Sequence, residues 1–263
     1  MKRTIALFLI LVLMVAMGTT AAATETAENI NGEEHKVQAV YQKGTKDKTI
    51  IDVDISWEQM IFTYEGKSEP VWNAEKLRYE GDATDEGWAA ETGLITICNN
   101  SNAVLQAKMV YEKDPAYTDV SMCFTDEAPY IGSAYTNDNQ DDEGNVCGTP
   151  CRVTIKAIPK GVLPSNAEEE TVIGTITISL EPCDDVFTML EELAVKIGEN
   201  NIDDLTGMNR GDPYLVAAAD TVALLDLVTA AMTAYADDTK IPEGNVAINK
   251  ALTAYYSALD MVR

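Results

Sequence analysis

The segment IDVDISWEQMIFTY, residues 51–64, decides the fold expected of this chain. Its apolar residues first take every second position, the period of a β-strand with one buried face: Ile51, Val53, Ile55 and Trp57. From Met60 to Tyr64 the alternation continues on the other parity, so we expect a bulge or turn near Glu58 and Gln59. The pattern returns from Leu105 to Tyr111, after the turn-forming cluster at residues 99–102.

Further short alternating segments surround these two blocks. They cover residues 37–41, 77–80, 94–98, 120–125, 152–158 and 176–180. About seven to nine short strands separated by turn signals are typical of an antiparallel β-sandwich. The sequence therefore predicts a mainly β fold, with an Ig-like sandwich over residues 37–182.

The composition changes after Pro182 and predicts a helical segment of about three helices over residues 183–263. Asp184 and Asp185 can cap a first helix, with apolar residues at helical spacing from Val186 to Ile197. Asp212 followed by Pro213 predicts the start of a second helix, which would run to Ala236. A third would begin at Gly244–Asn245 and run to Val262. The apolar second helix suggests self-association through these C-terminal helices.

The first 23 residues have the plan of a secretory signal peptide. Met1–Lys2–Arg3 is basic, an apolar run follows, and small residues end at Ala23. The alternative, an uncleaved membrane anchor, is less favoured because the apolar run is short for a span of about 20 residues. We expect a secreted, extracellular protein with a flexible polar leader at residues 24–36, and leave its retention at the cell surface open.

The chain has 43 acidic and 19 basic residues, a formal net charge of −24. Such a surface repels nucleic acid and anionic lipid, so no nucleic-acid partner is expected. One acidic loop offers alternating oxygen ligands of the kind calcium uses: Asn137, Asn139, Asp141 and Glu143. It lacks the glycine of a helix–loop–helix calcium site. We therefore interpret it as a solvated loop, with calcium as the alternative and no other cofactor.

Five cysteines follow the signal segment: Cys98, Cys123, Cys147, Cys151 and Cys183. Export permits disulfides, but an odd number leaves one thiol free or paired between molecules. Cys147 and Cys151 could close a loop on each other, or Cys147–Cys151 could pair with Cys123. The pairing cannot be deduced from spacing, and a single histidine, His35, argues against a zinc site.

The candidate ligand-binding residues are Trp72 and Trp88, which lie in loop-like sequence and could stack on sugars. The competing interpretation is that they fold over the end of the sandwich. Trp57 continues an apolar strand face and is expected in the core. The tripeptide Arg210–Gly211–Asp212 matches an integrin-binding motif, but Asp212 is already explained as a helix cap.

The sequence offers no catalytic constellation. His35 lies in the leader, which argues against Ser or Cys triads that need a histidine base. No glycine-rich phosphate loop follows a strand. An acidic hydrolase with paired carboxylates remains the catalytic alternative.

Several motifs taken together resemble a module of uncharacterised secreted and surface proteins of Gram-positive, largely gut-type, bacteria. They are VDISWEQMIFTYEG, Trp72, Tyr79, Gly87–Trp88, ITICNNSNAVLQAKMVY and IGTITISLEP, within about residues 37–182. Glu58 and the cysteines depart from that pattern. The resemblance implies an Ig-like fold and a surface or matrix role, without catalytic residues.

We therefore expect a secreted, non-catalytic surface or matrix protein acting in adhesion, assembly or structure. Its partner would be a protein or glycan outside the cell. The first alternative is a carbohydrate-binding module that uses Trp72 and Trp88. The second is the acidic extracellular hydrolase.

Overall fold

The structure is a computed structural model, and it describes residues 35–43, 47–58, 60–81, 85–165, 167, 170–202, 204–215, 218–237 and 239–263. Over residues 35–48 and 218–220 only the backbone is described. The expected signal peptide lies outside the described residues, as does most of the expected leader. The described chain is mainly β-strand and ends in three helices, as the sequence predicts.

The larger sheet has five antiparallel strands in the order β1-β2-β7-β13-β9. The strands are β1 His35–Lys43, β2 Asp47–Trp57, β7 Gly93–Asn99, β13 Cys151–Gly161 and β9 Val120–Phe124. In its centre, Ile55 of β2 and Val153 of β13 both lie opposite Ile97 of β7. These side chains are buried, so the alternation that predicted the strands is the alternation between the core and the outer face.

The smaller sheet has three antiparallel strands in the order β10-β8-β14. They are β10 Tyr130–Ile131, β8 Leu105–Lys113 and β14 Gly174–Pro182. Met109 of β8 lies opposite Ile178 of β14, and both are buried. The inward faces of both sheets belong to one continuous hydrophobic core.

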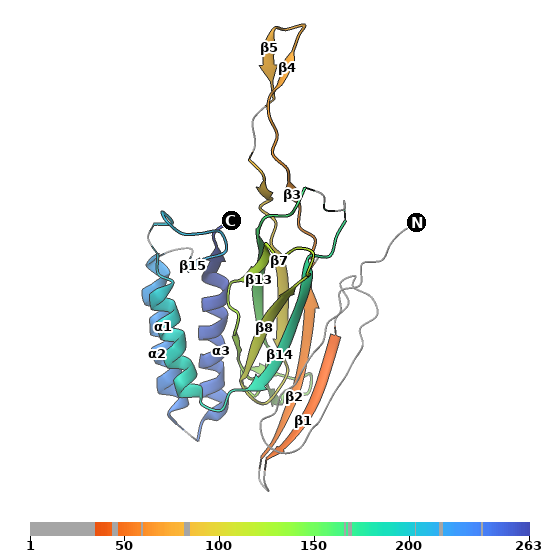
Figure 1. The fold of residues 1–263 in the computed structure, drawn as a ribbon. Helices are drawn as coiled ribbons and strands as arrows, with labels where there is room; N and C mark the ends of the chain where they lie inside the picture. The colour runs from red at the N-terminus through yellow and green to blue at the C-terminus, as the bar shows by residue number, and fades with distance from the viewer. Residues whose placement is uncertain are drawn as a thin grey trace.

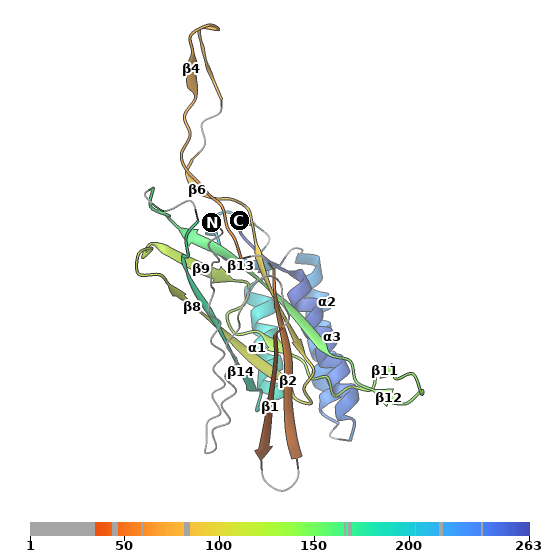
Figure 2. The same cartoon turned by 90° about the vertical axis from the view of Figure 1, so that its right-hand side faces the viewer.

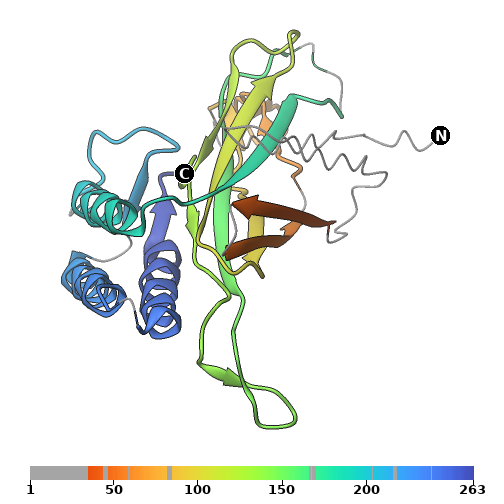
Figure 3. The same cartoon turned by 90° about the horizontal axis from the view of Figure 1, so that it is seen from below.

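The helices form a layer along one side of the sheets (Figures 1 and 3). They are α1 Val186–Glu199, α2 Ala218–Tyr235 and α3 Ile241–Ala258. Helix α3 lies against β13 and β10, and helix residues such as Leu193 and Leu252 belong to the same core as the strands. The strand part and the helical part are therefore packed as one body.

Polar contacts also join the helices to the strands. Lys196 of α1 forms an ion pair with Asp126 (Nζ–Oδ2 2.7 Å), and the Tyr256 hydroxyl donates to the same carboxylate (3.1 Å). The Asp126 side chain is only 8% exposed, so its charge is compensated where water is scarce. On the other side, Lys156 of β13 pairs with Asp260 (3.2 Å).

Two hairpins leave this body (Figures 1 and 2). The longer one, which we call the arm, runs from Tyr64 to Trp88. It contains the base strands β3 Tyr64–Glu65 and β6 Gly87–Trp88 and the outer strands β4 Val71–Asn73 and β5 Arg78–Glu80. The shorter one, the acidic hairpin, contains β11 Asn139–Gln140 and β12 Val146–Cys147.

Three expectations about the elements are wrong. Residues 60–63 form no strand; Met60 and Phe62 instead lie over Gly93, whose missing side chain leaves room for them. Asp212 caps no helix, because Pro213–Leu215 is strand β15, paired with β16 Leu259–Met261. The same pairing ends α3 at Ala258, before the expected Val262.

Candidate functional site

The base of the arm is fixed to the body by an aromatic pair. Trp88 packs edge-to-face on Tyr64, with ring centroids 5.0 Å apart, and β3 pairs with β6 at these two residues. The Trp88 indole N–H donates to the Gly161 carbonyl at the end of β13 (2.9 Å). Trp88 is half-buried with its polar group bonded, which makes it an anchor of the arm.

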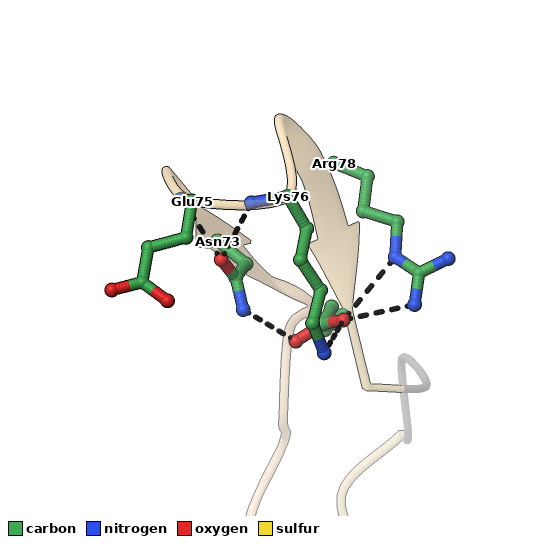
Figure 4. Close-up of polar contacts among 5 residues, drawn as sticks. Asn73, Glu75, Lys76 and Arg78 are labelled. Atoms are coloured by element: carbon green, nitrogen blue, oxygen red, sulfur yellow. Dashed lines mark hydrogen bonds and ion pairs between the residues drawn. The ribbon is translucent and has the colours of Figure 1, made fainter.

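Glu80 organises the tip of the arm, residues 71–80, through bonds from three side chains that Figure 4 labels: Asn73, Lys76 and Arg78. Its Oε1 accepts from Lys76 Nζ (2.9 Å) and from Arg78 Nη2 (3.0 Å). Its Oε2 accepts from Asn73 Nδ2 (2.7 Å). These hydrogen bonds lower the pKa of the Glu80 carboxyl below its ordinary value, and the bond from Lys76 has the largest effect.

Asn73 shapes the turn between the two outer strands. Its Oδ1 accepts the backbone N–H groups of Glu75 and Lys76, both at 3.0 Å. This is the side-chain-to-backbone bonding by which Asn initiates turns. The sequence at 73–78 thus closes the hairpin locally, without help from the body.

The two faces of the outer hairpin differ in chemistry. Trp72 lies opposite Tyr79, and their rings meet edge-to-face at 5.2 Å. Since side chains alternate along a strand, the Asn73–Arg78 pair lies on the other face together with Glu80. The tip therefore carries one aromatic face and one face with a hydrogen-bonded charge network, where Val71 lies opposite Glu80.

The tip exposes four large apolar side chains to solvent. Their exposed fractions are 73% for Val71, 49% for Trp72, 74% for Leu77 and 69% for Tyr79. Apolar side chains stabilise a fold when they are buried away from water. Within this chain these four side chains remain largely in contact with water, so they contribute little to folding. The tip and its approach are also locally neutral, because residues 67–80 hold three basic and three acidic residues.

Leu77 adds a second observation at the same place. Its backbone has φ of 49°, the left-handed region, and it is the one non-glycine residue with positive φ in the part of the chain that the structure describes. A branched hydrocarbon side chain there costs about 1–2 kcal/mol, whereas glycine or Asn would fit without strain. The turn thus holds a strained leucine outward in solvent.

The two candidate tryptophans are not brought together. Trp72 is on the outer strand β4, and Trp88 is on the base strand β6, near the opposite end of the arm (Figure 2). Trp72 is half exposed, while Trp88 is committed to Tyr64 and Gly161. A shared sugar platform of these two residues is not formed. Trp57 is partly buried against the core, as expected.

The four calcium candidates lie on or beside the acidic hairpin, whose strands β11 and β12 are labelled in Figure 2. Asn137 and Asn139 line a shallow surface hollow with their neighbours. Asp141 is used by the turn: its carboxylate accepts from Glu143 N–H (3.0 Å) and from Asn145 N–H (2.8 Å) and Nδ2 (2.9 Å). These bonds, led by that from the Asn145 side chain, lower the pKa of Asp141. Among the described residues no group of three or more His, Cys, Asp or Glu could hold a metal.

All five cysteines are free thiols in the structure: Cys98, Cys123, Cys147, Cys151 and Cys183. Cys151 is buried, and burial raises the pKa of its thiol to about 11, so it stays protonated at neutral pH. Cys123 lies against Gly211, where an added side chain would collide with its sulfur. The Cys147–Cys151 loop is therefore not closed by a disulfide.

The remaining candidates lie elsewhere. His35 begins β1, and only its backbone is described. Arg210 is turned inward, donating to the carbonyls of Pro159 and Ala89 (3.0 Å each), so the Arg210–Gly211–Asp212 motif is part of the packing. On α2, Leu224 and Val228 are buried, and Val222 is exposed beside small and polar residues.

Comparison of the chain with protein families, curated proteins and solved structures gave no match. Within the described ranges no helix is both long and apolar enough to cross a membrane.

Sequence reasoning named Trp72 but missed Val71, Leu77 and Tyr79 as parts of the same exposed tip. One signal was present in the sequence. The segment NAEKLR at residues 73–78 has a turn-initiating Asn between two apolar-aromatic pairs, Val71–Trp72 and Leu77–Tyr79. It predicts a hairpin, although it does not predict that the hairpin would leave the core.

Proposed function

We propose that this protein is a secreted, non-catalytic surface or matrix protein that acts in adhesion or assembly, and that the arm is its binding element. The observation that carries the proposal is the exposure of Val71, Trp72, Leu77 and Tyr79 at the end of a projecting hairpin. Grouped exposed apolar side chains mark binding sites, and Trp and Tyr are frequent anchors in interfaces.

The strained leucine supports the same proposal. The Leu77 side chain is largely exposed, and its backbone is strained. Burial of this side chain in a partner would explain why leucine, and not glycine, occupies the turn. The local neutrality of the tip also fits, because the body's net negative charge would otherwise hold other acidic surfaces away. The partner in this proposal is a protein or glycan outside the cell.

The proposal extends to the fold. We propose that the two antiparallel sheets are an Ig-like sandwich of the kind implied by the sequence resemblance. Two antiparallel sheets that share one core support this. Export of the chain rests on residues 1–23, whose sequence alone supports it.

A carbohydrate-binding role is the second candidate, and the half-exposed indole of Trp72 favours it. An indole face can stack on a sugar ring. In this form of the proposal Tyr79 is the companion of Trp72, and Trp88 only holds the arm in place.

The test measures how much labelled protein, residues 24–263, is retained by cells and extracellular matrix of the organism that secretes it. Trp72→Ala is expected to lower retention by about tenfold, as loss of a central aromatic anchor does. The matched control is Val222→Ala, which removes an exposed apolar side chain from α2. Equal retention of all three proteins contradicts the arm as binding element.

A glycan screen with the same proteins separates the two candidates. Saturable binding of a soluble oligosaccharide that is lost in Trp72→Ala favours the carbohydrate-binding role. Retention that is sensitive to Trp72→Ala but resistant to competing oligosaccharides, and abolished by protease treatment of the matrix, favours a protein partner.

A further inference from the structure

Within the part of the chain that the structure describes, strand β14 is paired along one edge only, and we call its other edge the open edge. β14 is hydrogen-bonded to β8 on one side, and no described strand pairs with its other side (Figure 1). Its segment GTITISL, residues 174–180, contains no charged residue, in a chain with 62 Asp, Glu, Lys and Arg residues out of 263. Natural edge strands are usually blunted by lysine, proline, a bulge or short length, and β14 has none of these before Glu181 and Pro182.

The hydrogen bonds that flank the ladder show which backbone groups face outward. Asp114 N–H donates to Ile173 O, and Cys183 N–H donates to Val104 O, both at 2.8 Å and both in the β8–β14 register. In an antiparallel ladder the bonded pairs alternate, so the odd-numbered residues of β14 bond to β8.

The even-numbered residues therefore direct N–H and C=O to the open edge: Gly174, Ile176, Ile178 and Leu180. The hydrogen bonds of β8 show the same alternation. Ala107 and Met109, which lie opposite Leu180 and Ile178, donate their N–H groups away from β14, to Pro129 O and Glu127 O. The open edge thus presents four N–H groups and four carbonyls in a row.

The side chains of β14 suit a further strand. Ile176, Ile178 and Leu180 are buried in the core, so the strand is held in its register with β8. Thr175, Thr177 and Ser179 form a row of hydroxyls on the outer face. Such rows pair across strands in this molecule: the hydroxyls of Thr96 and Thr154, on β7 and β13, are 3.0 Å apart.

We propose that the open edge of β14 binds β14 of a second copy of this chain, antiparallel and centred on Thr177. In this register Ile176 lies opposite Ile178 of the second copy, and Gly174 lies opposite its Leu180. All four outward N–H groups of each copy then have acceptors. Thr177 meets Thr177, and Thr175 meets Ser179.

Charge and sequence favour a second copy as the occupant. The two Glu181 side chains would lie at opposite ends of the paired strands, ~27 Å apart at 3.4 Å per residue. The leader segment TETAENINGEE, residues 24–34, is a poor strand for this edge, because it has four glutamates and a single large apolar residue, Ile30. By contrast, β14 of a second copy has the same length, the same lack of charge and the same row of hydroxyls as the edge to which it would bind.

The first test is the mass of residues 24–263 by light scattering across a concentration series. We expect a monomer–dimer equilibrium. Residues 24–263 lack Lys2 and Arg3, so each copy has 17 basic and 43 acidic residues and a net charge of −26. The dimer should therefore strengthen when salt is raised from about 0.02 M to about 0.3 M, which shortens the Debye length from ~20 Å to ~6 Å. A monomer at every concentration and salt overturns the proposal.

Thr177→Lys places two lysines opposite each other at the centre of the pairing and should weaken the dimer by at least about tenfold. The matched control is Val110→Lys, on the same sheet face directly opposite Thr177 but on the inner strand β8; it should leave the dimer intact. Mixing Thr177→Lys with Thr177→Glu should restore a mixed dimer. An unchanged dimer in Thr177→Lys contradicts the pairing.

A measurement on the unsubstituted protein keeps the proposal testable if Thr177→Lys does not fold. Backbone amide exchange at Ile176 and Ile178, whose N–H groups face the open edge, should slow as protein concentration rises. Exchange at these two amides that is independent of concentration overturns the proposal.

Discussion

At the scale of single residues, Leu77 combines two costs: a left-handed backbone and a largely exposed hydrocarbon side chain. Neither cost is offset by contacts within the chain that the structure describes. Its neighbours Trp72 and Tyr79 at least shield part of each other's rings. Leu77 is therefore the residue of the tip whose presence is hardest to explain by folding alone.

Replacing Leu77 by glycine should stabilise the arm. Leu77→Gly removes the strain of the positive φ and loses little buried area. Glycine also has a larger chain entropy in the unfolded state, which opposes this gain. We expect a net stabilisation of the hairpin of up to about 1 kcal/mol. Amide exchange of Arg78–Glu80 measures this locally. Lys76→Gly is the control, because Lys76 has no positive φ and its ammonium bonds Glu80. Faster exchange in Leu77→Gly would contradict the strain argument.

At the scale of elements, strands and the first helix follow from local sequence. The alternation at residues 94–98, 105–111 and 176–180 predicts β7, β8 and β14, because each strand has one face on a core. Asp185 predicts the start of α1, and its carboxylate does accept the N–H groups of Phe187 and Thr188. These features depend on neighbours in the sequence.

The predictions of elements fail where contacts with distant segments determine the local structure. Asp212–Pro213 has the local signature of a helix start, but Pro213–Leu215 pairs with Leu259–Met261. Asp212 serves a turn instead, accepting from Asn209 N–H (2.7 Å). Likewise, alternation near residues 71–80 cannot show whether a hairpin joins the core or leaves it. The candidate site was therefore predicted only through Trp72.

Arg210 connects the loop before β15 to the strand part of the molecule. Its guanidinium donates to Pro159 O and Ala89 O, and burial lowers its pKa without discharging it. We expect Arg210→Ala to lower the free energy of unfolding by about 1–2 kcal/mol, because two carbonyls lose charged donors. Chemical denaturation measures the change. Arg152→Ala, at an exposed position of β13, should change stability by less than about 0.5 kcal/mol. Equal losses in both variants would remove the proposed role of Arg210.

At the scale of the whole molecule, buried tyrosines should set the alkaline limit of stability. Burial, and then the charge of Asp114, raises the pKa of Tyr111 from its ordinary value of 10 to about 12. Burial also raises the pKa of Tyr255 and Tyr256. Between pH 10 and 12 the unfolded chain releases protons that the folded chain keeps, so stability falls as pH rises.

Tyr111→Phe isolates one of these groups. It loses the hydrogen bond to Ile173 O (2.7 Å), so it should be less stable at neutral pH. Its stability should then decline less steeply above pH 10, because one raised pKa is gone. Denaturation curves at several pH values measure both effects. An alkaline decline as steep as that of the original protein would show that Tyr111 does not contribute to it.

The body, the arm and the open edge have separate roles in this account. The two sheets and the helix layer share one core, which holds the arm and β14 in place. We propose that the arm tip presents apolar side chains to a partner and that β14 pairs with a second copy. Assembly and adhesion can thus be tested by different substitutions, Thr177→Lys for one and Trp72→Ala for the other.

Site-specific photo-crosslinking can show whether the arm tip contacts a partner, as we propose. A photoreactive phenylalanine analogue would replace Leu77 in one sample and Val146, exposed on the acidic hairpin, in another. Both proteins would be irradiated on cells and extracellular matrix of the source organism. We expect a discrete crosslinked product from position 77 and none from position 146. No product from position 77, or the same products from both positions, would contradict the claim.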